Sequence, residues 1–248
     1  KFSCLEVSDF TNSPEILEGR VKTLHPKIHA GILNKRNNKK HLNDLKKNDF
    51  ENIDLVIVNF YPFEKTLETT NNHNKIIENI DIGGPTMVRS AAKNYNDVTV
   101  VTSINQYQEL IDEMNKNNGA TSLKFRKELS RNAFTETAYY DSVISNYFNK
   151  KTNTHLPEKK VFSANLIEKL RYGENPHQFS GYYSKNLKTN LEQIQGKQLS
   201  YNNYNDIFAA LTISKSLPKK RGTVILKHAN PCGVSIKSDP LDSYNSAL

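Results

Sequence analysis

Two short apolar runs mark the first part of the chain. Residues 54–60 read DLVIVNF and stop just before Tyr61-Pro62, and residues 97–103 read DVTVVTS. Both runs are rich in β-branched residues and do not alternate with polar positions, so they predict strands buried on both faces. Between them, residues 85–94 read PTMVRSAAKN after two glycines, and a proline in this place favours a helix start. Strand, helix and strand in this order predict a βαβ unit with a parallel sheet, hence an α/β fold.

The pattern is interrupted and then begins again. Residues 123–148 have apolar positions at helical spacing and predict one or two helices. Residues 149–160, NKKTNTHLPEKK, have no periodicity and predict a linker between two domains. The expected elements beyond it are a helix or extended segment over 163–171, a helix over 206–217 and a strand over 223–226. Since the chain opens at Lys1 without Met and stops after few elements of the second domain, we expect it to be part of a longer protein.

Composition narrows the class of protein. The chain has 248 residues, enough for one large domain or two smaller ones. No apolar run reaches the roughly 18 residues that a membrane-spanning helix needs, and the first residues do not resemble a secretory signal. The two cysteines, Cys4 and Cys232, stand at opposite ends of the sequence, which excludes a disulfide scaffold. These features predict a cytoplasmic protein without a membrane partner.

The net charge of +8 raises the question of nucleic-acid binding. About one residue in eight is asparagine, and lysine and asparagine share the polar stretches 34–48 and 115–118. A nucleic-acid interface gathers lysine, arginine and aromatic residues on one face, whereas here the charge is scattered. We therefore expect no nucleic-acid partner, and the charge remains compatible with an anionic small molecule such as a phosphate ester.

The segment 19–33, GRVKTLHPKIHAGIL, concentrates hydrogen-bond donors. Arg20, Lys22, His25, Lys27 and His29 lie within ten positions, an arrangement that suits a phosphorylated ligand. A solvated basic loop explains the composition equally well. The two histidines are four residues apart, but a proline follows the first and no glutamate accompanies them, so a zinc-protease motif is excluded and we expect no metal.

A second candidate is the segment Asp81-Ile82-Gly83-Gly84. It places a carboxylate before a glycine-rich helix start, whose free amides can hold an anion or a developing oxyanion. Lys93 follows on the same predicted helix, and Tyr61 lies at the end of the neighbouring strand, where ligands bind in open parallel sheets. An ordinary turn with a capping aspartate is the alternative.

Two further candidates lie beyond the predicted linker. Residues 226–233, LKHANPCG, put Lys227 and His228 at the end of a strand, where imidazole can act as a base and ammonium can stabilise an oxyanion. We expect Asn230-Pro231 to form the turn that presents them. The zinc-deaminase motif is not matched, and Cys232 reads as a structural residue more readily than as a nucleophile. Residues 171–178, RYGENPHQ, are almost entirely polar and fit either a ligand site or a surface turn.

Taken together, these segments resemble a known family. The chain contains, in order, GRVKTLHPKIHAGIL, NFYPF, IDIGGPTMVRSAAKNY, LRYGENPHQ, LSYNNYND and LKHANPCGV. Their sequence and order are similar to those of the bifunctional AICAR transformylase/IMP cyclohydrolase family of purine biosynthesis. The resemblance implies a methylglyoxal-synthase-like IMP cyclohydrolase domain over 1–156, lacking its amino end. It also implies the start of a cytidine-deaminase-like transformylase domain over 160–248, lacking its carboxyl part.

The resemblance also implies roles for individual residues. In the cyclohydrolase domain the catalytic residues would be Lys22, Tyr61, Asp81 and Lys93, with Arg20, Thr23 and Gly83 binding the substrate. In the transformylase domain Lys227 and His228 would be the catalytic pair, and the residues contacting the AICAR ribotide would be Arg171, Tyr172 and Asn203.

The implied activity is the last two steps of IMP synthesis. A formyl group would pass from the co-substrate 10-formyltetrahydrofolate to AICAR, and formyl-AICAR would then close to IMP without a metal. The implied partners are AICAR, formyl-AICAR, IMP and folate, together with a second copy of the protein in a homodimer. The alternative is a non-catalytic regulatory domain that binds a phosphometabolite, for which Lys22, Tyr61, Asp81 and Lys93 together would not be required.

Overall fold

The two apolar runs form a parallel pair of strands, as predicted. In the computed structural model, which describes residues 3–185, 191–219 and 221–248, they are β1 (Leu55–Ile57) and β2 (Thr99–Val101). Val56 lies opposite Val100 in a parallel register. Both strands are shorter than the predicted runs, although backbone hydrogen bonds from Val58 to Val101 and from Thr99 to Asp54 continue the pairing. Between them, α6 (Gly83–Lys93) completes the predicted βαβ unit and begins two residues before Pro85.

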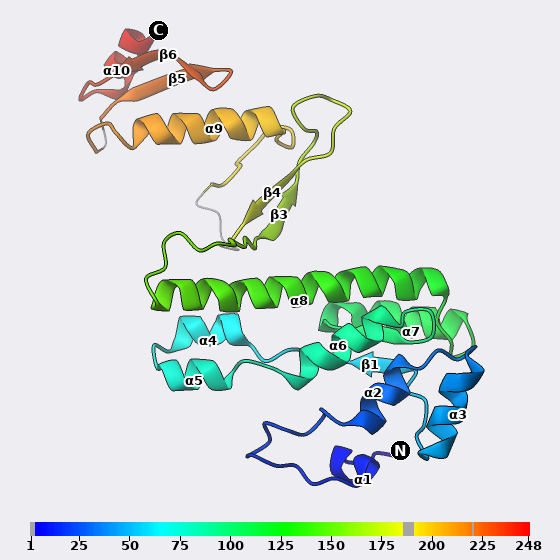
Figure 1. Cartoon of the computed structure of the whole chain (residues 1–248). Helices are drawn as coiled ribbons and strands as arrows, with labels where there is room; N and C mark the ends of the chain where they lie inside the picture. The colour runs from blue at the N-terminus through cyan, green and yellow to red at the C-terminus, as the bar shows by residue number, and fades with distance from the viewer. Residues whose placement is uncertain (1–2, 186–190, 220) are drawn as a thin grey trace. The chain divides into compact units, whose positions relative to one another are not determined.

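The core of this part of the chain is built around β2. Val98, Val100 and Val101 are almost fully buried, since helices cover the short sheet. On α6, Val88, Ala91 and Ala92 are buried, and the small alanines allow α8 (Leu123–Lys151) to pack closely. Figure 1 shows α8 as the long green helix that runs beside α6. Strand β2 of the βαβ unit therefore lies in an aliphatic core.

The segment predicted as one or two helices is a single helix. Ser122 caps α8 at its start by accepting a hydrogen bond from the Phe125 amide. The helix continues to Lys151, so the first three residues of the predicted linker 149–160 are helical. The prediction placed the end at Phe148 because the polar residues after it break the apolar pattern, but an exposed helix end does not need that pattern.

The chain divides into two compact units, which we call unit 1 (Lys1–Phe162) and unit 2 (Ser163–Leu248). Unit 1 also contains α1 (Val7–Thr11), α2 (Pro26–Leu33), α3 (Lys39–Lys47), α4 (Phe63–Thr69), α5 (His73–Glu78), the 3₁₀ helix η1 (Ile104–Gln106) and α7 (Tyr107–Lys116). A domain boundary between 156 and 160, with one activity on each side, stays a prediction.

The described strands of unit 2 form two antiparallel pairs. β3 (Asn165–Lys169) pairs with β4 (Gly181–Ser184), and β5 (Thr223–Lys227) pairs with β6 (Asn230–Ser235). Of the two predictions for 163–171, the extended segment is the one observed. The remaining elements are α9 (Tyr201–Ser214) and α10 (Pro240–Ala247). Both units therefore combine helices and strands, which confirms the predicted α/β class.

Two predicted boundaries in unit 2 are wrong for local reasons. Helix α9 begins at Tyr201, five residues before the predicted start, because Ser200 and Asn203 cap each other's backbone amides. An asparagine in place of the usual Glu or Gln hides this capping box in the sequence. The turn after β5 is formed by His228 and Ala229, and not by Asn230-Pro231, which begin β6.

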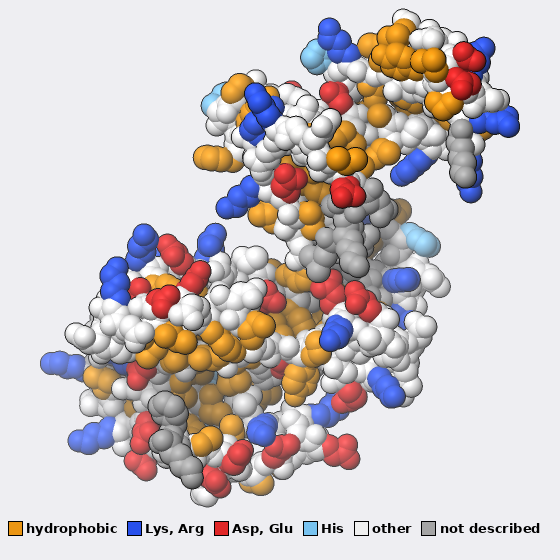
Figure 2. All heavy atoms as spheres, turned by 180° about the vertical axis from the view of Figure 1, so that it is seen from behind, with side chains coloured by type: hydrophobic (Ala, Val, Ile, Leu, Met, Phe, Trp, Pro, Cys, Tyr) orange, Lys and Arg blue, Asp and Glu red, His pale blue; other side chains and the backbone are white. Residues whose placement is uncertain are grey.

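The basic side chains are scattered over the surface, as the sequence predicted (Figure 2). Figure 2 shows lysine and arginine side chains spread over the visible face of each unit and mixed with acidic ones. Within the described residues, no helix is both long enough and apolar enough to cross a membrane.

Candidate functional site

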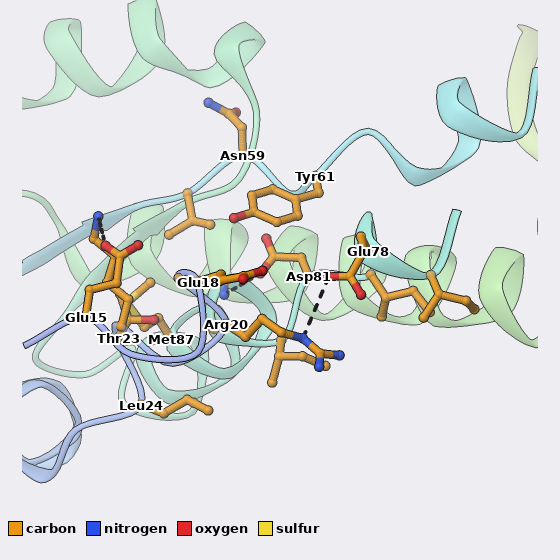
Figure 3. A pocket seen from close by; sticks show the side chains of 18 residues that line it. Glu15, Glu18, Arg20, Thr23, Leu24, Asn59, Tyr61, Glu78, Asp81 and Met87 are labelled. Carbon is orange, nitrogen blue, oxygen red and sulfur yellow. Dashed lines mark hydrogen bonds and ion pairs between the residues drawn. The ribbon is translucent and has the colours of Figure 1, made fainter. Parts of the chain in front are cut away.

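A pocket of about 600 Å³ lies in unit 1 beyond the carboxyl end of β1. Its size is typical of a small-molecule site. Three segments form it: the loop before α2, the end of β1, and the start of α6 with the turn before it. The predicted residues among those lining it are Arg20, Lys22, Thr23, Tyr61, Asp81 and Gly83. The folding of the βαβ unit thus brings together residues up to 72 positions apart, from Glu15 to Met87, as Figure 3 shows for the side chains labelled there.

A small hairpin carries the cations of the pocket. Ile16 and Val21 pair through two backbone hydrogen bonds of 3.2 and 3.3 Å, and residues 17–20 form the loop between them. Leu17 and Glu18 both have φ of 55°, a left-handed conformation that side chains other than glycine adopt at a cost of order 1–3 kcal/mol. Such strain is common in loops that present functional groups. The hairpin ends with Lys22 beside the pocket.

Each cation of the hairpin has an acidic partner. The Lys22 ammonium lies 3.0 Å from a carboxylate oxygen of Glu15, and the Arg20 guanidinium lies 3.7 Å from Glu78. The hydrogen bond and the charge of Glu15 raise the pKa of Lys22, so this side chain is a stable cation at neutral pH. These acidic partners were missed in the sequence, since neither belongs to a recognisable motif.

Asp81 is fixed from two directions at the start of α6. Its side-chain Oδ1 accepts a 2.8 Å hydrogen bond from the Gly84 amide. Its own amide donates to the hydroxyl of Tyr140, which in turn donates to the Asn79 carbonyl. Tyr140 is buried and packs against Phe60 with ring centroids 5.1 Å apart. The carboxylate is therefore presented by a loop that α8 holds through one buried tyrosine.

The two glycines of the motif are required by close approaches. A Cβ at Gly83 would collide with the Thr23 hydroxyl, and a Cβ at Gly84 would collide with the Asp81 carboxylate. The absence of a side chain at Gly83 thus allows the loop that contains Thr23 to pack against the start of α6. In the view of Figure 3, Asp81 lies between Tyr61 on one side and Arg20 on the other. The Tyr61 side chain is 54% exposed and can meet a ligand without rearrangement.

Three of the five donors noted in the segment 19–33 have structural roles. Pro26 begins α2, so the second half of that segment is a helix and not a loop. His25 caps this helix by accepting from the Lys27 amide, and the Lys27 ammonium lies 4.8 Å from the centre of the Phe10 ring. His29 makes a 3.2 Å hydrogen bond with Ser90. Composition overestimated the number of basic residues available to a ligand, because a count of residues does not show which of them cap or pack against a helix.

Burial also perturbs His29 on α2. Its Nε2 is buried without a hydrogen-bond partner among the described residues. Burial lowers the pKa of His29, an effect that the nearby Thr23 carbonyl opposes without making a hydrogen bond to Nε2. The imidazole is therefore neutral at pH 7 and adds no positive charge to this region.

Lys93 is placed differently from the other predicted residues. It is exposed in the last turn of α6, ten residues after Gly83. That separation corresponds to about 15 Å along a helix axis. Lys93 does not belong to the set of described residues that line the pocket. Lys93 therefore does not join the other candidate residues at this pocket, and its catalytic role stays a prediction.

In unit 2, Lys227 and His228 lie where β5 turns into β6. His228 and Ala229 form a two-residue turn with φ of 53° and 59°, the left-handed conformation of tight hairpins. The Ala229 amide donates a 2.7 Å hydrogen bond to Asp206 on α9, which anchors the turn. The side chains of Lys227 and His228 are both exposed. Asp206 was missed as a functional candidate because its partner is distant in sequence.

The predicted ribotide-contacting residues of unit 2 cluster around the start of α9. The Arg171 guanidinium stacks 4.8 Å from the centre of the Tyr172 ring, and the Tyr172 carbonyl accepts from the Tyr201 amide. Asn203 caps α9 and stands one turn before Asp206, so the helix start joins this cluster to the His228 turn. Across the described residues, no group of three or more His, Cys, Asp or Glu side chains could hold a metal ion.

Comparison with known proteins decides the family. The family described as "AICARFT/IMPCHase bienzyme" matches residues 91–248, and the "MGS-like domain" matches residues 1–86. The chain belongs to the AICARFT/IMPCHase bienzyme family. The match covers most of the chain and confirms the resemblance inferred from the six segments.

The chain is similar to curated relatives of this family. It is 47% identical over 249 residues to the "Bifunctional purine biosynthesis protein PurH" of Bradyrhizobium diazoefficiens, covering 98% of this chain and 47% of the relative. It is 49% identical over 259 residues to the protein of the same name from Prochlorococcus marinus (strain MIT 9515), covering 100% of this chain and 50% of the relative. The chain thus spans about half the length of the curated relatives that it matches.

Proposed function

We propose that the complete protein catalyses the last two steps of IMP synthesis, with unit 1 closing formyl-AICAR to IMP and unit 2 contributing to formyl transfer onto AICAR. The observation that carries this proposal is the pocket of unit 1. Six of the seven residues that the family resemblance assigns to cyclisation line it together. The membership of the chain in the bienzyme family and the name of its curated relatives support the same activity.

Cyclisation asks mainly for positioning. The carboxamide nitrogen of formyl-AICAR attacks the formyl carbon of the same molecule, and the resulting hydroxyl leaves as water. Holding the two groups within reach removes most of the entropic barrier. Asp81, fixed by the Gly84 amide, is suited to accept the proton of the attacking nitrogen. Lys22 and Tyr61 can stabilise the negative charge on the formyl oxygen and protonate it before water leaves.

Formyl transfer needs a base beside the acceptor amine. We assign this role to His228, whose imidazole takes the proton as the 5-amino nitrogen of AICAR bonds to the formyl carbon. The bond between that carbon and the folate nitrogen then breaks, and the folate nitrogen takes up a proton. Lys227 stabilises the intermediate oxyanion. The formyl donor in this proposal is 10-formyltetrahydrofolate, and neither step requires a metal.

The proposed partners follow from this chemistry. They are AICAR, formyl-AICAR, IMP and folate, with a second copy of the protein in a homodimer. Lys93, which is exposed in the last turn of α6, has no part in the cyclisation steps proposed above. None of the observations above favours the regulatory alternative, since a simple effector site has no need for a fixed carboxylate beside a tyrosine and a lysine.

The test uses the complete protein and two separate assays. Lys22→Ala and Asp81→Ala should each lower the rate of IMP formation from formyl-AICAR by about 10²-fold or more, as loss of a positioned acid–base or oxyanion group does. Formyl transfer should stay within a factor of about two, because the residues belong to separate compact units. Equal loss of both activities in well-folded variants would contradict the assignment.

A further inference from the structure

Acidic residues outnumber basic ones in the lining of the pocket. Arg20 and Lys22 are its two cations, whereas four acidic residues line it: Glu15, Glu18, Glu78 and Asp81. The proposed chemistry uses only the last of these. Both cations that a ligand would contact are already in ion pairs, Arg20 with Glu78 and Lys22 with Glu15. The proposed chemistry gives these two glutamates no function.

We propose that Glu15 is a positioning residue that holds the Lys22 ammonium in place at the pocket through the hairpin joining them. The proposal rests on the proposed function, because it concerns how Lys22 is prepared for cyclisation. Its geometric basis is the pairing of Ile16 with Val21. In an antiparallel pair the residues on either side of a bonded pair also face each other, so the hairpin sets Glu15 opposite Lys22.

The loop of the hairpin is shaped to allow this contact. Gly19 has φ of 88°, and a Cβ at that position would lie 2.6 Å from Oε1 of Glu15. The other carboxylate oxygen, Oε2, is the one that lies 3.0 Å from Lys22. Gly19 thus leaves room for the carboxylate to reach across the hairpin. Leu17 and Glu18 take the left-handed conformation at a cost, and Gly19 follows them with a positive φ that only glycine adopts freely, so the loop brings Glu15 and Lys22 together.

The surroundings of Lys22 single out Glu15 as its main partner. Glu15 raises the pKa of Lys22 most strongly, through a hydrogen bond and its charge, and Glu6 and Tyr61 add smaller effects in the same direction. Of the other charged residues at the pocket, Arg20 pairs with Glu78 and Asp81 is held by Gly84. Because both side chains of the Glu15–Lys22 pair are 44% exposed, the pair adds little to stability, and its value lies in placing one ammonium group.

The experiment compares Glu15→Gln with Glu18→Gln in the complete protein. Both substitutions remove one acidic charge from the same pocket, but only Glu15 contacts Lys22. In Glu15→Gln, kcat for cyclisation should fall about tenfold with little change in KM, because the ammonium loses its position. The alkaline limb of the pH–rate profile should move to lower pH, since the pKa of Lys22 falls when its partner is neutral. Glu18→Gln should show neither effect.

A second measurement does not depend on activity. The Lys22 side-chain carbon next to the amine, followed by NMR over pH in this chain, should titrate at lower pH in Glu15→Gln than in the wild type or in Glu18→Gln. An unchanged titration and an unchanged profile would overturn the proposal, as would equal effects of the two substitutions. If instead the wild type lacks cyclisation or Lys22→Ala retains it, the proposed function itself fails.

Discussion

The pocket of unit 1 and the Lys227-His228 turn of unit 2 present functional groups in opposite ways. In the pocket, the charged side chains are tied down by partners on separate elements, such as Gly84 for Asp81 and Glu15 for Lys22. At the turn, the backbone is anchored by Asp206 while the two side chains stay exposed. A ring closure within one molecule needs a fixed shape, whereas transfer between two substrates needs groups that both can reach. The contrast therefore matches the two proposed reactions.

The largest expected effect tests the exposed turn. His228→Ala in the complete protein should lower formyl transfer by about 10²–10⁴, the usual loss when a general base is removed. Cyclisation should be unchanged, because the pocket of unit 1 does not involve this residue. Stopped-flow or steady-state assays of each step measure both effects. A fall in formyl transfer that is matched by loss of the folded state in thermal melting would argue for a structural histidine instead.

The next effect tests how firmly Asp81 is held. Tyr140→Phe removes a buried hydroxyl that accepts from the Asp81 amide and donates to the Asn79 carbonyl. Leaving these two backbone groups unpaired should cost about 1–3 kcal/mol of unfolding free energy, measured by denaturant melts. Cyclisation should slow as well, while formyl transfer should not. Tyr139→Phe, on the same helix, is the control, and an equal loss of cyclisation there would remove the special role of Tyr140.

A smaller effect addresses the strained turn. Ala229→Gly should stabilise the chain by about 0.5–1 kcal/mol, because glycine adopts the left-handed φ of 59° more readily than alanine does. The greater freedom of glycine in the unfolded chain limits the gain. The hydrogen bond from the backbone amide to Asp206 is kept. A lower melting temperature would show that the turn in solution is not left-handed at this position.

The smallest effect concerns pH and Tyr204 on α9 of unit 2. Burial, followed by the hydrogen bond to Glu168, raises the pKa of Tyr204 from 10.0 to about 12. The unfolded chain therefore loses this proton first, and the stability that the neutral hydroxyl contributes is present below pH 10 and lost as the pH rises toward 12. Unfolding midpoints between these pH values should fall more steeply in the wild type than in Tyr204→Phe. Identical slopes would show that the hydroxyl titrates normally.

How far sequence reasoning reaches is visible in particular elements. The apolar runs at 54–60 and 97–103 and the glycines at the start of α6 predicted the βαβ unit, because burial on both faces leaves a pattern that local residues alone carry. The six ordered segments predicted the family, which the comparison confirmed. Helix ends and turns were predicted less well. The Ser200–Asn203 cap of α9 and the left-handed His228-Ala229 turn between β5 and β6 depend on conformation and not on residue type.

The candidate site likewise has features that the sequence predicted and features that only the structure shows. From the sequence came the residue types that suit cyclisation, at positions such as Lys22, Tyr61 and Asp81. Only the folded structure shows that His25 caps α2 and that Lys27 contacts Phe10, and tertiary contacts decided that Glu15, Tyr140 and Asp206 hold the functional groups. The physical reason is that a motif records which side chains are present, whereas a hydrogen bond or ion pair between distant positions exists only after the chain has folded.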